Sequence, residues 1–203
     1  MRDRPALIFE APDGQTSRMG FADVDRAAKG LATTLRGLRY RRGDRIGLHT
    51  GQHPATAVAH MAIAATGRVA VTLSQLHGPD TLAHPVQDSR SHALLTGDPA
   101  WADLRGERAA LFPDLVHMVT RDPVAAEIDI CAAMASDPAG FTPGFGGADD
   151  PALLMCTSGS NGKPKGILHG HRILAAYTPS THPFFNLSMQ DDDAVFWSPF
   201  DRA

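Results

Sequence analysis

The sequence predicts an α/β domain built on a largely parallel sheet flanked by helices. Three features indicate this class. Segments with apolar residues at helical spacing alternate with short apolar runs of strand length. The connections between them are short and carry glycine or aspartate at the turns, as in folds where each helix returns the chain to a parallel strand. The composition, 43% hydrophobic and 20% charged, is typical of a folded chain of 203 residues.

The chain begins with the pattern of a hairpin. "ALIFEAPDGQTSRMGF" holds an apolar run, an Asp13–Gly14 turn and a polar strand. A helix over residues 23–38 follows, because Asp23 is a suitable N-cap and apolar residues then recur at helical spacing. The stripe consists of Val24, Ala27, Ala28, Leu31, Leu35 and Leu38.

Alternating elements continue to about residue 96. Gly67 is suited to end a helix in the left-handed conformation, and Gly43–Asp44 predicts a turn. Pro85 falls inside an expected helix, where it should cost about 3 kcal/mol or force a kink. The expected elements are a strand at Arg45–His49, a helix at His53–Thr66, a strand at Arg68–Leu73, a helix at 79–90 and a strand at His92–Thr96.

The second half is less regular. We expect a short helix and a strand at Leu115–Val119, and a surface connection over 136–151, which is rich in glycine, proline and aspartate. A buried strand at Ala152–Cys156, a helix beginning at Arg172–Tyr177 and a strand at Ala194–Ser198 complete the reading, with one of Phe196 and Trp197 in the core. This divides the chain into an α/β half (1–135), a linker (136–151) and a last segment (152–203).

Charge and cysteine content exclude several classes. A net charge of −3 leaves no basic excess for a general nucleic-acid binder. Cys131 and Cys156 lack CxxC spacing and are expected to be buried small hydrophobes, which favours a reducing compartment. Charge and proline near the N-terminus do not fit a signal peptide, and no run is long enough for a membrane helix. We therefore expect a cytoplasmic protein with no membrane span.

The stretch "TSGSNGKPKG", Thr157–Gly166, carries the strongest chemical signal. It follows an apolar strand and contains glycines that allow unusual dihedrals and close approach of a ligand to the backbone. Hydroxyl donors and Lys165, stiffened by Pro164, complete a site for several negative oxygens, as in a polyphosphate. The Walker pattern is excluded because Pro164 follows Gly162–Lys163, and the Rossmann fingerprint is absent.

Other polar clusters give weaker evidence of a functional site. His169 and His171 would share a face of a strand, but with no carboxylate or cysteine nearby we expect packing beside the ligand, and no metal site. The run Asp191–Asp193 is typical of a solvated turn, and "RYRR" (39–42) of a solvated helix end.

The stretch resembles the phosphate-binding signature T-S-G-[ST]-T-G-x-P-K-G of the adenylate-forming (AMP-binding) superfamily, with Asn161 in place of a threonine. The flanks "FADVDRAAKGLATTLRGLRYRRGDRIGL" and "AIAATGRVAVTLSQLHGPDTLAHPVQDSRSHALLTGD" resemble the same family, and are most similar to short- and medium-chain acyl-CoA synthetases. "DDDAVFWSPFDRA" resembles the stretch that follows the loop there. Thr72, where the family commonly has proline, and Phe200 and Arg202 depart from its pattern.

The resemblance implies an N-terminal fragment of such an enzyme, an incomplete N-terminal domain without the C-terminal domain. Members of this family are acid–thiol ligases linked to fatty acid metabolism. They join a carboxylic acid to coenzyme A through an acyl-adenylate, using ATP and Mg²⁺. It implies that Thr157, Ser158, Gly159, Ser160, Asn161, Gly162 and Lys165 bind ATP, with Lys165 catalytic. The family's magnesium and ribose ligands would lie beyond residue 203. The alternatives are an inactive, poorly soluble remnant that forms no acyl-CoA, or a simple nucleotide-binding module.

Overall fold

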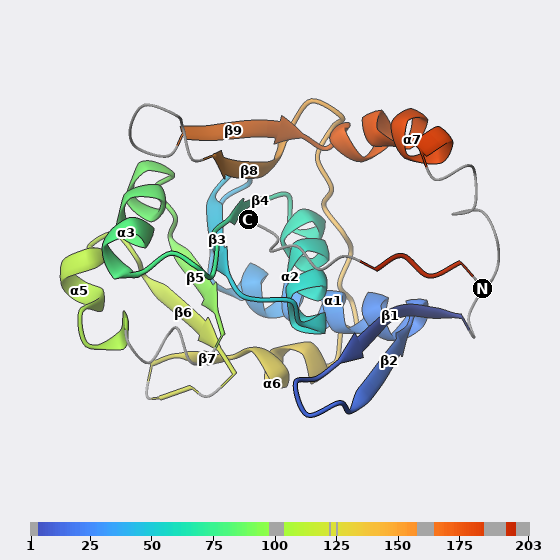
Figure 1. The fold of residues 1–203 in the computed structure, drawn as a ribbon. Helices are drawn as coiled ribbons and strands as arrows, with labels where there is room; N and C mark the ends of the chain where they lie inside the picture. Colours follow the sequence, from blue (N-terminus) through green and yellow to red (C-terminus); the bar gives the residue numbers. More distant parts are fainter. Residues whose placement is uncertain are drawn as a thin grey trace.

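The structure is a computed structural model that describes residues 4–97, 104–121, 123–124, 126–157, 165–184 and 194–197. Within these residues the chain forms a two-stranded hairpin and one seven-stranded sheet with helices on both faces (Figure 1). The elements are β1 (Pro5–Glu10), β2 (Thr16–Gly20), α1 (Phe21–Gly37), β3 (Arg45–His49), α2 (Pro54–Ala65), β4 (Val69–Thr72), α3 (Pro79–Asp88), β5 (Ala93–Thr96), α5 (Arg108–Leu111), β6 (His117–Thr120), β7 (Ile128–Asp129), α6 (Ile130–Ala135), β8 (Pro151–Thr157), β9 (Lys165–Gly170) and α7 (Ile173–Phe184).

The predicted fold class is confirmed by the order of the strands. The large sheet runs β7-β6-β5-β3-β4-β8-β9, and every neighbouring pair is parallel except β8 with β9. The parallel strands therefore all end at one edge of the sheet, which is called the carboxyl edge below. Loops at this edge are where open α/β sheets bind ligands.

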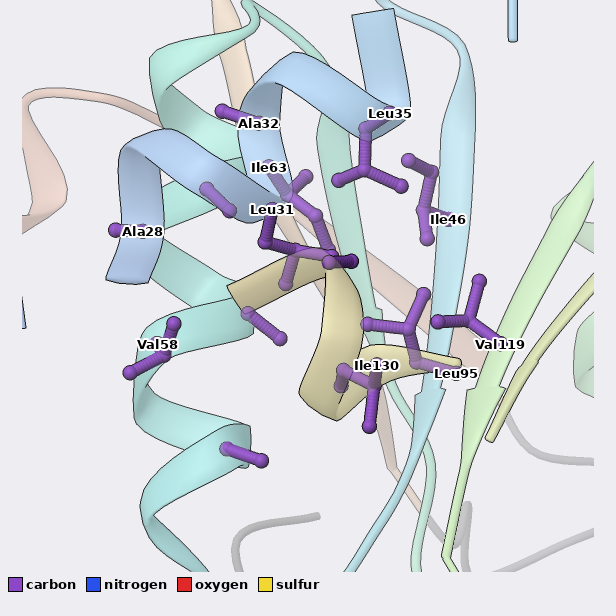
Figure 2. Close-up of a cluster of buried hydrophobic side chains, with 14 of the residues drawn as sticks. Ala28, Leu31, Ala32, Leu35, Ile46, Val58, Ile63, Leu95, Val119 and Ile130 are labelled. Carbon is purple, nitrogen blue, oxygen red and sulfur yellow. The ribbon is translucent and has the colours of Figure 1, made fainter. Parts of the chain in front are cut away.

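Two apolar layers hold the sheet between the helices. Strand residues alternate between the faces: Ala70 packs toward α1, α2 and α6, whereas the next residue, Val71, packs toward α3 and α5. Figure 2 shows the first layer, where Leu31 and Leu35 of α1 lie against Ile63 of α2 and the strand residue Ile46. The stripe predicted for residues 23–38 is thus the buried face of α1, with only Val24 and Leu38 partly buried.

The hairpin and the turn glycines agree with the sequence. β1 and β2 pair antiparallel, and Gly14 has a φ of +82° in the connecting turn. Gly43 and Gly67 also take positive φ values, 79° and 68°, and Gly67 follows α2 as a left-handed residue. Pro85 lies buried inside α3, and the helix continues through it to Asp88.

Three expectations about the second half were wrong. Residues 194–197 form no strand, and Val195, Phe196 and Trp197 are 71%, 62% and 78% exposed, so neither aromatic ring is in the core. A strand forms only as part of a ladder with a neighbouring strand, and residues 194–197 belong to neither of the two described sheets. Cys131 is exposed and not a buried hydrophobe, because it lies on the outer side of α6, while Cys156 is half-buried against the second layer.

The sequence reading also missed α6 and the short strand β7. Asp129 caps α6, because its carboxylate accepts hydrogen bonds from the backbone amides of Cys131 and Ala132 at 2.8 and 3.1 Å. An N-cap aspartate before "ICAAMA" was the available signal. The segment 136–150 is irregular, as expected, but it is tied down by Phe141, which is buried beneath the guanidinium of Arg36.

Candidate functional site

The expected phosphate-binding stretch connects the hairpin β8–β9. β8 is parallel to β4, so its last residue, Thr157, lies at the carboxyl edge of the sheet. β9 returns antiparallel, and Thr157 pairs with Lys165 as the final pair of the ladder. The Thr157 hydroxyl lies 3.4 Å from the Lys165 carbonyl oxygen, to which it donates. The structure therefore brings these two predicted residues together at the open end of the hairpin.

The other predicted binding residues, Ser158, Gly159, Ser160, Asn161 and Gly162, lie outside the described residues, as does Pro164. Lys165 itself is exposed at the start of β9. Within the described part of the chain its ammonium group has no hydrogen bond or ion pair. The lysine is consequently available to an anion approaching from solvent.

The two histidines after the loop do not share a strand face. His169 lies in β9, opposite Leu153, whereas His171 lies beyond the end of the strand, in a turn. The backbone amide of His171 donates to the carbonyl of Asp150 at 3.1 Å. The i, i+2 argument fails because the strand ends at Gly170, whose missing side chain lets the backbone approach the Ala148 carbonyl: a Cβ there would come within 2.9 Å of that oxygen.

The base of the hairpin is fastened to the body of the sheet by Arg42. Its guanidinium donates to the Gly144 carbonyl at 2.8 Å and to the Asp150 carboxylate at 3.1 Å. Asp150 also accepts from the Gly147 amide at 2.9 Å, and these bonds, the Gly147 one first, lower the pKa of its carboxyl group. Reading "RYRR" as a solvated helix end missed this contact, because the partners lie more than a hundred residues away in the sequence.

A second ion pair lies at the same base, between Arg172 and Asp149. Both side chains are more than half exposed, so the pair contributes little to stability by itself. The two pairs, Arg172–Asp149 and Arg42–Asp150, both lie directly before the first residue of β8. The hairpin is thus oriented by polar contacts on one side and by its ladder with β4 on the other.

The described residues contain no group of three or more histidine, cysteine, aspartate or glutamate side chains that could hold a metal ion. Asp191–Asp193 lie outside the described residues. None of the helices in the described ranges combines the length and apolar character needed to cross a bilayer.

Known proteins resemble the chain over almost its whole length. The profile of a family described as "AMP-binding enzyme" matches residues 1–201. The acetyl-coenzyme A synthetase of Streptomyces coelicolor is 28% identical over 218 aligned residues, which cover 98% of this chain and 33% of that protein. The acetyl-coenzyme A synthetase of Nostoc linckia is 27% identical, with 98% of this chain and 64% of the relative covered.

Solved structures show the same architecture. The acetoacetyl-CoA synthetase from Streptomyces lividans superimposes with a TM-score of 0.82 at 24% identity, covering 89% of this chain and 30% of that one. The anthranilate CoA ligase AuaEII, solved in complex with anthranoyl-AMP, superimposes with a TM-score of 0.78 at 25% identity, covering 87% and 33%. The chain therefore spans about a third of the length of the Streptomyces coelicolor relative and of both solved structures.

Proposed function

Because the chain belongs to the family of AMP-binding enzymes, we propose that it is the N-terminal portion of an ATP-dependent, AMP-forming acyl-CoA synthetase. Its own contribution is to hold the phosphates of ATP. In this proposal residues 1–135 form the α/β half, 136–151 the linker and 152–203 the segment with the phosphate loop. The coenzyme A ligase names of the relatives support the thioester chemistry.

One observation carries the proposal. The connection between β8 and β9 opens at the carboxyl edge of a parallel sheet, with the exposed residue Lys165 at its base. Ligands of open α/β sheets bind at this edge. Thr157, Ser158, Gly159, Ser160, Asn161, Gly162 and Lys165 are the residues that we assign to the phosphates.

The chemistry of these groups suits the first half-reaction. A carboxylate oxygen attacks the α-phosphorus of ATP, and the bond to the bridging oxygen breaks to release pyrophosphate and leave an acyl-adenylate. Backbone amides, hydroxyl groups and Lys165 offset the negative charge on the β- and γ-phosphates as that bond breaks. In the second half-reaction the thiol of coenzyme A displaces AMP.

The described donors fit an anion better than a cation. At the base of the loop Thr157 offers a hydroxyl and Lys165 an ammonium, and no carboxylate of the described residues joins them in a group that could hold a metal. We therefore propose that Mg²⁺ comes to this site bound to the nucleotide, where it would offset phosphate charge.

The test measures ATP binding by the purified 203-residue chain and by its Lys165→Ala variant. The control is Lys29→Ala, which removes an equal charge from α1, where Lys29 pairs with Asp25 at 2.7 Å. Losing one charge-assisted hydrogen bond should weaken ATP binding by about tenfold. The control should bind as the parent does, and Lys165→Ala should unfold at the same urea concentration as the parent because Lys165 is exposed.

Equal ATP affinity in the Lys165→Ala and Lys29→Ala variants would remove the assignment of Lys165. A parallel assay for acyl-CoA, with acetate and coenzyme A added, separates the remaining alternatives. ATP binding without product agrees with an N-terminal portion and with a nucleotide-binding module, acyl-CoA formed by this chain would exclude the remnant, and a chain with neither activity would indicate a remnant.

A further inference from the structure

A cavity at the carboxyl edge lies away from the phosphate loop, at the point where the strand order reverses. From β3 the chain moves to β4 on one side, and then crosses to β5 on the other side of β3. In open α/β sheets the crevice between two such strands is the usual ligand site. A cavity of about 320 Å³ opens there, lined by Thr50, Gly51 and His53 after β3, by Thr96 and Gly97 of β5 and its end, and by Arg121 after β6.

Arg121, at one end of the cavity, lies across the sheet from the loop between β8 and β9. Strand order places β6 four positions from β8, which at about 4.8 Å per strand is about 19 Å across the sheet. The cavity extends from Arg121 to Gln75, which follows β4 beside β8, so a small ligand held on Arg121 lies at the end of the cavity away from Lys165.

Among the described residues, those that line the cavity carry positive charge. No aspartate or glutamate is among the described residues that line the cavity. Arg121 is exposed at its rim, and within the described part of the chain its guanidinium forms no hydrogen bond or ion pair. Burial and the charge of Arg121 lower the pKa of His53, which is therefore neutral at pH 7. The Arg121 guanidinium is thus an exposed planar group with several N–H donors, which suits an oxyanion.

The N-terminus of α2 does not supply this positive character. His53 caps the helix, because its Nδ1 accepts from the Ala55 amide at 3.1 Å and its carbonyl accepts from the Thr56 amide at 2.9 Å. Pro54, the first helical residue, has no amide hydrogen. The first donors of the helix are consequently already used, which leaves the recognition of charge to Arg121.

The walls of the cavity are fixed and partly apolar. The Thr56 hydroxyl donates to the Gly51 carbonyl at 2.6 Å, and a Cβ on Gly51 would come within 2.0 Å of the Gln75 side chain, so this part of the wall is closely packed. Phe9 of β1 meets the ring of His53 edge-on, with centroids 5.1 Å apart, and Ile130 lines the cavity from α6. A ligand with a small apolar or aromatic body would contact these side chains.

We propose that this cavity is a second ligand site, which binds a small organic anion with its carboxylate or phosphate on Arg121 and its apolar body against Phe9 and Ile130. The proposal is independent of ATP binding at the loop. A carboxylate and a phosphate monoester share the chemistry that Arg121 recognises, so the test includes one probe of each kind.

The experiment is hydrogen–deuterium exchange of the purified 203-residue chain at low concentration, with phenyl phosphate, benzoate or the neutral analogue benzamide. We expect phenyl phosphate, benzoate or both to protect residues 50–56 and 96–97, and benzamide to protect neither segment. Arg121→Gln should weaken the protecting probe about tenfold, the value of one charge-assisted contact. Arg39→Gln, at an exposed arginine outside the cavity, and Lys165→Ala should leave the affinity unchanged.

Three results would overturn the proposal: no protection of these segments by either anion, equal protection by benzamide, or full affinity in Arg121→Gln. Protection confined to β8 and β9 and lost in Lys165→Ala would also count against it, because the anion would then be bound at the phosphate loop. Loss of ATP binding alone, with the cavity still protected, would instead contradict only the proposed function.

Discussion

Replacing Gly30 by alanine has two opposing effects on the free energy of unfolding, one from helix propensity and one from packing. Gly30 lies in the middle of α1, where alanine is intrinsically better than glycine by about 0.5–1 kcal/mol. In the structure, however, a Cβ at this position would lie 2.8 Å from the Ala133 carbonyl oxygen and 3.0 Å from those of Met134 and Ser136. These are backbone atoms at the end of α6, so they cannot rotate away as a side chain would.

The balance of the two effects can be worked out from these distances. Overpacking by one carbon costs about 1–3 kcal/mol when the neighbours are fixed. The shift would also strain the hydrogen bond that Ser136 donates from its hydroxyl to the Gly30 carbonyl at 3.2 Å. Subtracting the gain in propensity from the middle of this range leaves a net loss of about 1 kcal/mol for Gly30→Ala.

Gly37→Ala is the matched control. Gly37 is the last residue of the same helix, and a Cβ there meets nothing within 4 Å. It should raise the free energy of unfolding by up to about 1 kcal/mol. The two variants should therefore differ by about 2 kcal/mol, or by about 4–8 °C in melting temperature for a chain of this size.

The assay is urea unfolding of both variants and the parent, followed by far-UV circular dichroism, with equal slopes required for the comparison. The expected order of stability is Gly37→Ala, parent, Gly30→Ala. If Gly30→Ala is as stable as Gly37→Ala, the close contact between α1 and α6 does not exist in solution, and the reasoning is wrong.

Further predictions concern Thr72, His53 and Arg42. The Thr72 hydroxyl is buried without a partner in the described part of the chain, so Thr72→Val should raise the free energy of unfolding by about 1 kcal/mol. Thr96→Val removes a hydroxyl that lies 3.3 Å from the Nδ1 atom of His49, so it should lower the free energy of unfolding by a similar amount in the same urea assay. Burial, and then the charge of Arg121, lower the pKa of His53 from 6.5. As the pH falls, this imidazole is therefore protonated in the unfolded chain before it is protonated in the folded chain. The folded chain therefore has its full stability above pH 6.5 and loses part of it as the pH falls toward the folded pKa of His53. Urea midpoints measured between pH 7.5 and pH 5 should fall less in His53→Asn, which keeps the helix cap. Arg42→Gln should speed amide exchange in the segment 144–150 but change the free energy of unfolding by less than about 1 kcal/mol, since the ion pair is exposed; unchanged exchange would show that Arg42 does not fasten the hairpin.

Local patterns predicted most of the regular elements. The stripe from Ala27 to Leu35 repeats every three or four residues, and that spacing alone makes one face of α1 apolar. Gly14 and Gly67 could be assigned to turns for a similar reason, because their positive φ is a property of the residue and its immediate neighbours. Where an apolar run lacked a strand partner, as at Val195–Trp197, the same reasoning gave the wrong answer.

The sequence by itself thus determined the class of fold and the stretch between Thr157 and Lys165 that marks the family. Only the tertiary structure decided that β8 pairs with β4, that Arg42 reaches Asp150, and that Arg121 and His53 face one cavity. The physical reason is that backbone periodicity depends on residues a few positions apart. Strand order and cavities, in contrast, depend on which surfaces, distant in sequence, bury each other at the lowest free energy.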